Sequence, residues 1–210
     1  MSHFTVAVFS RSPDDVETML DPFYEGVDCN SEYAEFVEDD GCDYDERAGA
    51  KGYWCNPSAK WDWYSIGGRW SGLLRLKNSD NTVDSARVLE CDFSPDKEEY
   101  DQAVRFWEVV VDGQPLRDGE KEEDFSSWYK PQYFIDQYRT KENYAEQLSM
   151  FSTYAFLTAD GEWNEPGEMG WFGFADTTAD SRDAYNKAFD AYLKQAHNED
   201  LFITIVDCHI

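Results

Sequence analysis

Basic residues are scarce in this 210-residue chain, which holds 18 Lys and Arg against 44 Asp and Glu. Its formal net charge is therefore −26. Proteins that bind DNA or RNA directly need positive surface to contact the phosphates, so the composition argues against that class. Binding to an anionic membrane surface is disfavoured for the same reason.

Long apolar runs are also missing, since none approaches the roughly 18 residues of a membrane-spanning helix. The first residues lack the basic region and cleavage site of a signal peptide, so we expect none. None of the five cysteines is spaced as CxxC, and the sequence identifies no cofactor. We expect free thiols, a cytoplasmic location and no membrane partner.

Apolar side chains are nevertheless sufficient for a folded core, because hydrophobic residues make up 41% of the chain and aromatic residues 17%. The two terminal segments, 3–10 and 201–206, are the most apolar strand candidates, which predicts that they lie in the middle of a sheet. Helices are expected over 95–110, 132–150 and 181–197. We predict a single α+β domain over residues 1–210, with a mixed or antiparallel sheet and about three helices.

The segment 51–77 reverses the charge of the chain, with five Lys or Arg and one Asp. Four of the eight tryptophans lie between residues 54 and 70, and a Gly67-Gly68 turn predicts a hairpin there. Aromatic faces can stack on a base or sugar, and cations can hold a phosphate. The candidate ligand-binding residues are Lys60, Trp61, Trp63, Arg69 and Trp70. The alternative is a core hairpin whose cations pair with nearby acids.

A second candidate segment, 161–173, is rich in glycine and tryptophan and is predicted to be an irregular loop. Its Glu165 and Glu168 are candidates for a general base or for an acceptor from ribose hydroxyls, with Glu168 favoured as the catalytic residue. Trp171 is a further stacking candidate. The alternative is a structured loop whose tryptophans plug the core.

The end of the chain, Asp207-Cys208-His209, offers side chains that can act as nucleophile or metal ligand. His3 comes near them if the terminal strands pair, so His3, His209 and Cys208 are weak metal candidates. Alternation along a strand, however, places Cys208 on the opposite side from Asp207 and His209. The alternative is a packed Cys208 and a His209 at a strand end.

The acidity itself suggests a different function. Residues 14–46 hold 14 Asp or Glu and no Lys or Arg, and the predicted loop 112–124 is also charged. Rows of carboxylates can imitate the phosphates of nucleic acid and occupy a nucleic-acid-binding channel on another protein. The alternative is a solvated surface that maintains solubility or suits high salt.

Several strings resemble a group of phage and prophage open reading frames, and together they span the whole chain. They are the start MSHFTV, the block from Asn56 to Trp70, the PGEMGW string at 166–171 and the ending TIVDCHI. The resemblance implies a context and no mechanism. It suggests a cytoplasmic accessory protein made during phage infection, one that handles host defences or nucleotides and does not build a virion.

Three functions are compatible with these features. The first is a counter-defence protein that binds a nucleotide-like anion, with or without hydrolysing it, through Lys60, Trp61, Trp63, Arg69, Glu168 and Trp171. The second is an acidic mimic of nucleic acid that inhibits a host nuclease or an RNA-guided or restriction complex. The third is a structural or interaction protein without a ligand.

Overall fold

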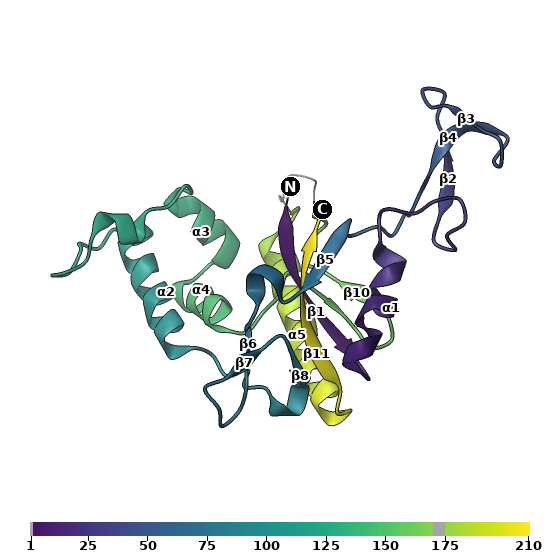
Figure 1. Cartoon of the computed structure of the whole chain (residues 1–210). Coiled ribbons are helices and arrows are strands. Elements are labelled where there is room, and N and C mark those ends of the chain that lie inside the picture. Colours follow the sequence, from purple (N-terminus) through teal and green to yellow (C-terminus); the bar gives the residue numbers. More distant parts are fainter. Residues whose placement is uncertain (1, 170–174) are drawn as a thin grey trace.

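The two ends of the chain form the centre of the molecule (Figure 1). The computed structural model describes residues 2–169 and 175–210. Strand β1 (His3–Ser10) pairs antiparallel with β11 (Phe202–His209) along the full length of both strands. Nearly all of their residues are buried, as is typical of strands covered on both faces. The prediction that the terminal strands are central is confirmed.

A mixed sheet grows outward from this pair in the order β10-β9-β1-β11-β5. Strand β9 (Ala155–Leu157) runs parallel to β1, and β10 (Trp163–Asn164) pairs antiparallel with β9. On the other side, β5 (Trp63–Ile66) pairs with the end of β11, and β8 (Ser85–Arg87) pairs with its beginning. The mixed α+β class is as predicted.

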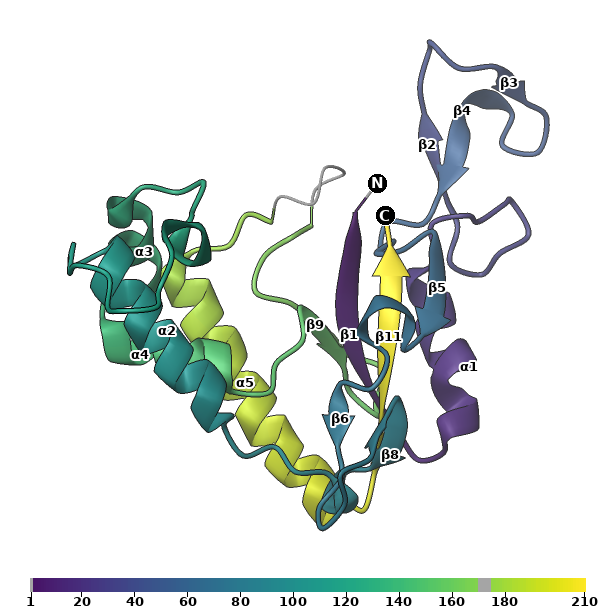
Figure 2. The ribbon, with the colours of Figure 1, turned by 60° about the vertical axis from the view of Figure 1, so that its left-hand side comes forward.

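Helices cover both faces of this sheet. Odd-numbered residues of β1 and β11, such as Phe9 and Ile205, pack against α5 (Ala179–Asn198), the long helix of Figure 2. Even-numbered residues, such as Val6 and Val206, pack on the opposite side, together with Leu20 of α1 (Val16–Leu20). This alternation decides which polar side chains meet at the ends of the strands.

Three further helices form a lobe with its own small core (Figures 1 and 2). They are α2 (Lys97–Val110), α3 (Pro131–Tyr138) and α4 (Lys141–Ser149). The described residues thus contain five α-helices, more than the three expected. The helix expected over 132–150 is divided because Arg139 adopts a positive φ of 65° and Thr140 caps the next helix.

The hairpin predicted around Gly67-Gly68 does not form. Strand β5 pairs with β11, and after it the chain enters a short 3₁₀ turn, η3 (Gly68–Trp70). Strand β6 (Leu74–Arg75) pairs instead with β7 (Thr82–Val83). Apolar segments on either side of a glycine pair are typical of a hairpin. In this fold, β5 pairs instead with the longer central strand β11.

A small sheet of three strands projects from the body as an arm (Figure 1). It consists of β2 (Glu35–Glu38), β3 (Tyr44–Asp45) and β4 (Ala50–Cys55). Most of its side chains are exposed. Within the described residues, no helix is both long and apolar enough to cross a membrane.

Truncation of Phe9 tests the core under α5. Its side chain is fully buried against Phe156, Phe189 and Tyr192. We expect Phe9→Ala to lower the free energy of unfolding by about 3–5 kcal/mol, measured by urea denaturation. Tyr44→Ala is the control, because Tyr44 is 62% exposed and a surface change costs about 0.5 kcal/mol or less. Equal losses in the two variants would contradict this packing.

Candidate functional site

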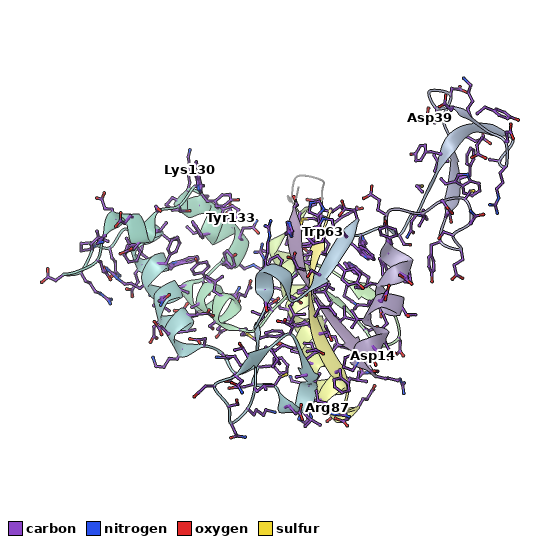
Figure 3. The ribbon with its side chains drawn as sticks, viewed as in Figure 1. Asp14, Asp39, Trp63, Arg87, Lys130 and Tyr133 are labelled. Carbon is purple, nitrogen blue, oxygen red and sulfur yellow. The ribbon has the colours of Figure 1, made fainter. Side chains whose placement is uncertain are left out.

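Polar side chains replace the apolar core where β1 begins and β11 ends. His3 lies opposite His209, and Thr5 lies opposite Asp207. On the other side of β11, Trp63 of β5 lies opposite His209. Residues directly opposite each other in an antiparallel pair share a face. Two histidines, an aspartate and a tryptophan therefore gather on the side of the sheet that carries α5; Trp63 is labelled in Figure 3.

The buried carboxylate of Asp207 joins two segments. Its Oδ1 lies 2.8 Å from Nδ1 of His3, and its Oδ2 accepts a hydrogen bond of 3.0 Å from the backbone N–H of Arg69. Asp207 is only 2% exposed, so it depends on these partners to offset the loss of water. A carboxylate can only accept, so Nδ1 of His3 donates.

His209 makes a second pair of the same kind. Its Nδ1 lies 2.6 Å from Oδ1 of Asp62, and its backbone C=O accepts from the Asp62 N–H at 3.0 Å. The indole of Trp63 stacks on the His209 ring with centroids 5.3 Å apart. The His3 and His209 rings meet edge to face at 5.0 Å. We call His3, Asp62, Asp207 and His209 the His–Asp cluster.

This arrangement leaves the same atom of each imidazole available. Both Nδ1 atoms are taken by carboxylates, which orients the rings and fixes the tautomer of a neutral ring. The described residues offer no hydrogen bond to either Nε2. Each Nε2 therefore keeps its hydrogen-bonding capacity, within side chains that are only 11% exposed in His3 and 6% exposed in His209.

The two glycines before Arg69 make room for carboxylates. Gly67 and Gly68 have φ values of 69° and 52°. A Cβ at Gly67 would overlap the Asp84 carboxyl, and one at Gly68 would overlap Asp207. Side chains of the protein itself therefore occupy the space beside both glycines.

The structure divides the predicted ligand-binding residues between two places. Trp63 and Arg69 lie beside the His–Asp cluster, and both are exposed. Lys60 forms an ion pair of 2.7 Å with Glu165, which also accepts from the Trp163 indole. Lys60 and Glu165 lie at the β10 edge of the sheet, in a pocket that Trp163 and residues of α5 also line. Arg69 follows β5, at the other end of the strand order.

Two other predicted tryptophans are structural. Trp61 is 6% exposed, and its indole N–H donates to the backbone C=O of Leu20. Trp70 packs against the core under α5.

Glu168 is exposed on the loop after β10, and only its backbone C=O is seen to accept a hydrogen bond, from Asp176. Trp171 lies outside the described residues.

Cys208 faces away from the cluster, as strand alternation predicted. It is buried on the α1 side, and burial raises the pKa of its thiol. A raised pKa disfavours the thiolate that a nucleophile or a metal ligand requires. The residues 2–169 and 175–210 contain no group of three or more His, Cys, Asp or Glu arranged to hold a metal ion.

Sequence reasoning missed Asp62 as a partner of His209. It was counted only as the one acid of a basic segment, because its role depends on the pairing of β5 with β11.

Two pockets were also not predicted from the sequence. One of about 650 Å³ adjoins Lys60, Trp163 and Glu165, and one of about 980 Å³ lies between α2 and the loop that follows it.

Comparison with known proteins adds no relative, because no family model, no curated protein and no solved structure matches the chain. The resemblance to phage reading frames stays an expectation drawn from short motifs.

Substitution of Gly68 tests the contact between η3 and Asp207. Gly113 has a similar φ of 70°, but no atom lies within 4 Å of the place a Cβ would take there, so Gly113→Ala measures the cost of the backbone conformation alone. We expect Gly68→Ala to destabilise the protein by about 1–3 kcal/mol more than Gly113→Ala, because the new Cβ displaces Asp207. Urea unfolding of both variants provides the measurement, and equal losses would contradict the contact.

Proposed function

We propose that this protein binds a nucleotide-like anion at the surface formed by Trp63, Arg69 and the His–Asp cluster. The observation that supports the proposal is the pair of oriented imidazoles beside an exposed tryptophan and an exposed arginine. Compared with the set derived from sequence, the proposed site keeps Trp63 and Arg69 and gains Asp62, Asp207 and the two histidines. It leaves out Lys60, Trp61, Trp70, Glu168 and Trp171.

Each part of this surface suits a different part of such a ligand. Trp63 is 45% exposed and can stack on a base. The planar guanidinium of Arg69 can donate to phosphate oxygens, and so can Nε2 of an imidazole when its ring is protonated. The carboxylates on Nδ1 hold the two rings in place before the anion arrives.

Arg69 is tied to the His–Asp cluster through its backbone N–H, which donates to Asp207. Five other arginines form ion pairs with carboxylates: Arg75, Arg87, Arg105, Arg117 and Arg139. Within the described residues no carboxylate pairs with Arg69, as is also the case for Arg11, Arg47 and Arg182. The exposed guanidinium of Arg69 is therefore a donor group that an anion can use without first displacing an acid.

The resemblance to phage reading frames suggests a biological role for such binding. In an infected cell the protein would bind, and so withdraw, a nucleotide that signals host defence. Its net charge of −26 keeps it off cellular nucleic acids, which would otherwise compete for the same donors.

Ligand-induced stabilisation tests the site directly. Thermal unfolding would be followed with nucleoside mono-, di- and triphosphates and with cyclic dinucleotides. A ligand at a hundredfold excess over its Kd adds about 2.7 kcal/mol of stability. We expect Arg69→Ala to weaken binding about 10-fold or more, since a charge-assisted hydrogen bond contributes about 1.5–3 kcal/mol. We expect a similar loss for Trp63→Ala, since stacking of a base on an aromatic ring contributes about 1–3 kcal/mol.

Matched controls are available for both variants. Arg11 is another exposed arginine, and Trp128 is fully exposed on the helical lobe. Arg11→Ala and Trp128→Ala should leave the midpoint shift unchanged. No shift with any of these ligands, or a shift that all four variants share, would count against the site.

A second candidate function draws on the projecting arm. The acids of β2–β4 and their loops are carried away from the body, with Asp39 near the tip (Figures 1 and 3). Such an extended acidic element can enter a basic channel that normally holds nucleic acid. In this second function the arm inhibits a nuclease or a nucleic-acid-guided complex of the host.

Charge removal separates this function from the first. The variant replaces five exposed acids of the arm by amides: Glu35, Glu38, Asp40, Asp43 and Glu46. If the arm inhibits a nuclease, inhibition of nuclease activity in a host extract should weaken with salt and disappear in this variant. The control neutralises five exposed acids of the helical lobe: Glu98, Glu99, Asp136, Glu142 and Glu146. Full inhibition by the arm variant would refute the mimic.

A further inference from the structure

We infer that the His–Asp cluster hydrolyses phosphodiesters, with His209 as general base and His3 as general acid. The inference rests on the proposed function, because the diester must first bind at this surface. It adds a reaction and a substrate class, and it transfers the catalytic role expected of Glu168 to two histidines that lie together.

The geometry of the two rings suits such a reaction. Two proton-transfer groups must reach two oxygens of one phosphorus atom within hydrogen-bond distance, about 2.6–3.2 Å. The two ring centroids lie 5.0 Å apart, so one phosphate can lie near both rings. Each ring is also held by a carboxylate on Nδ1, as in catalytic triads, where an aspartate orients the histidine and stabilises the charge it acquires.

The two aspartates differ in burial, and this difference assigns the acid and base roles to the two histidines. Asp207 is 2% exposed, and a carboxylate removed from water requires a compensating charge. We assign the acid role to His3, which faces this buried carboxylate. The side chain of Asp62 is 42% exposed, so water solvates its charge. We assign the base role to Nε2 of His209, whose Nδ1 faces Asp62.

The reaction then balances with water as the only co-reactant. Nε2 of His209 takes a proton from a water molecule as its oxygen forms a bond to phosphorus. The bond between phosphorus and the leaving alkoxide breaks, and that oxygen receives the proton from Nε2 of His3. The products are a phosphomonoester and an alcohol. Proton exchange with solvent restores both rings.

Arg69 and Trp63 complete the arrangement without transferring protons. The guanidinium can balance the charge that develops on the non-bridging oxygens. Trp63 stacks on His209 and limits the positions its ring can take. Asp62 is a positioning residue, because it acts on the substrate only through His209.

Hydrolysis of two diester probes, bis(4-nitrophenyl) phosphate and cyclic di-AMP, tests the inference. Assays with EDTA present exclude an adventitious metal. We expect His3→Gln and His209→Gln to lower kcat by about 10²- to 10⁴-fold, while the thermal shift given by cyclic di-AMP becomes smaller and stays measurable, because Trp63 and Arg69 remain. Asp62→Asn should lower kcat less and leave KM unchanged. The control is His197→Gln, because His197 is exposed at the end of α5 and should keep full activity.

The outcomes are distinguishable. A thermal shift without hydrolysis of either diester would overturn the inference and leave the proposed binding function intact, whereas neither shift nor hydrolysis would overturn both. Activity that EDTA abolishes and Zn²⁺ restores would assign the reaction to a metal and overturn the acid–base roles. Circular dichroism checks the fold of each variant. If His3→Gln unfolds, the kcat values of His209→Gln and Asp62→Asn test the inference. Asp62→Asn is expected to fold, because the Asp62 side chain is 42% exposed.

Discussion

Antiparallel pairing of β1 with β11 is the constraint on which the rest of the structure depends. It joins residues about two hundred positions apart, from His3 opposite His209 to Ser10 opposite Phe202. A slip by one residue would turn every side chain of a strand to the other face. Both faces of this pair carry apolar cores. A slip would move the side chains of each core to the opposite face, where they do not fit the packing. The packing of the core therefore fixes which polar residues meet at the strand ends.

Asp207 connects this register to the candidate site. A buried ion pair adds little net stability, because desolvation offsets the attraction, but removal of one partner leaves an uncompensated charge. Asp207 therefore needs both His3 and the Arg69 N–H, and the N–H is in place only because Gly68 permits the close approach of η3. The turn that carries Arg69 and the ring of His3 are thus held by the same carboxylate. A change in either is expected to move the other.

Local pattern predicted the fold better than it predicted the site. The apolar composition of residues 3–10 and 201–206 was enough to place the terminal strands at the centre, and strand alternation correctly separated Cys208 from His209. The grouping of Lys60 with Arg69 was based on nearness in sequence. Lys60 pairs with Glu165 beside β10, whereas Arg69 follows β5, which is at the other end of the strand order. The pairing of Asp62 with His209 depends on that same long-range register, which periodicity does not contain.

The strong negative charge and an anion site are compatible because the charge acts over a limited range. At physiological ionic strength, screening reduces interactions between exposed charges beyond about 8 Å. The acids of β2–β4 project away from the sheet (Figure 1), and those of the helical lobe surround a separate core. An anion at Trp63 would respond mainly to the nearest groups, which are the two imidazoles with their carboxylates and Arg69. The two proposed functions thus use different parts of the molecule, so a variant that removes one should leave the other measurable.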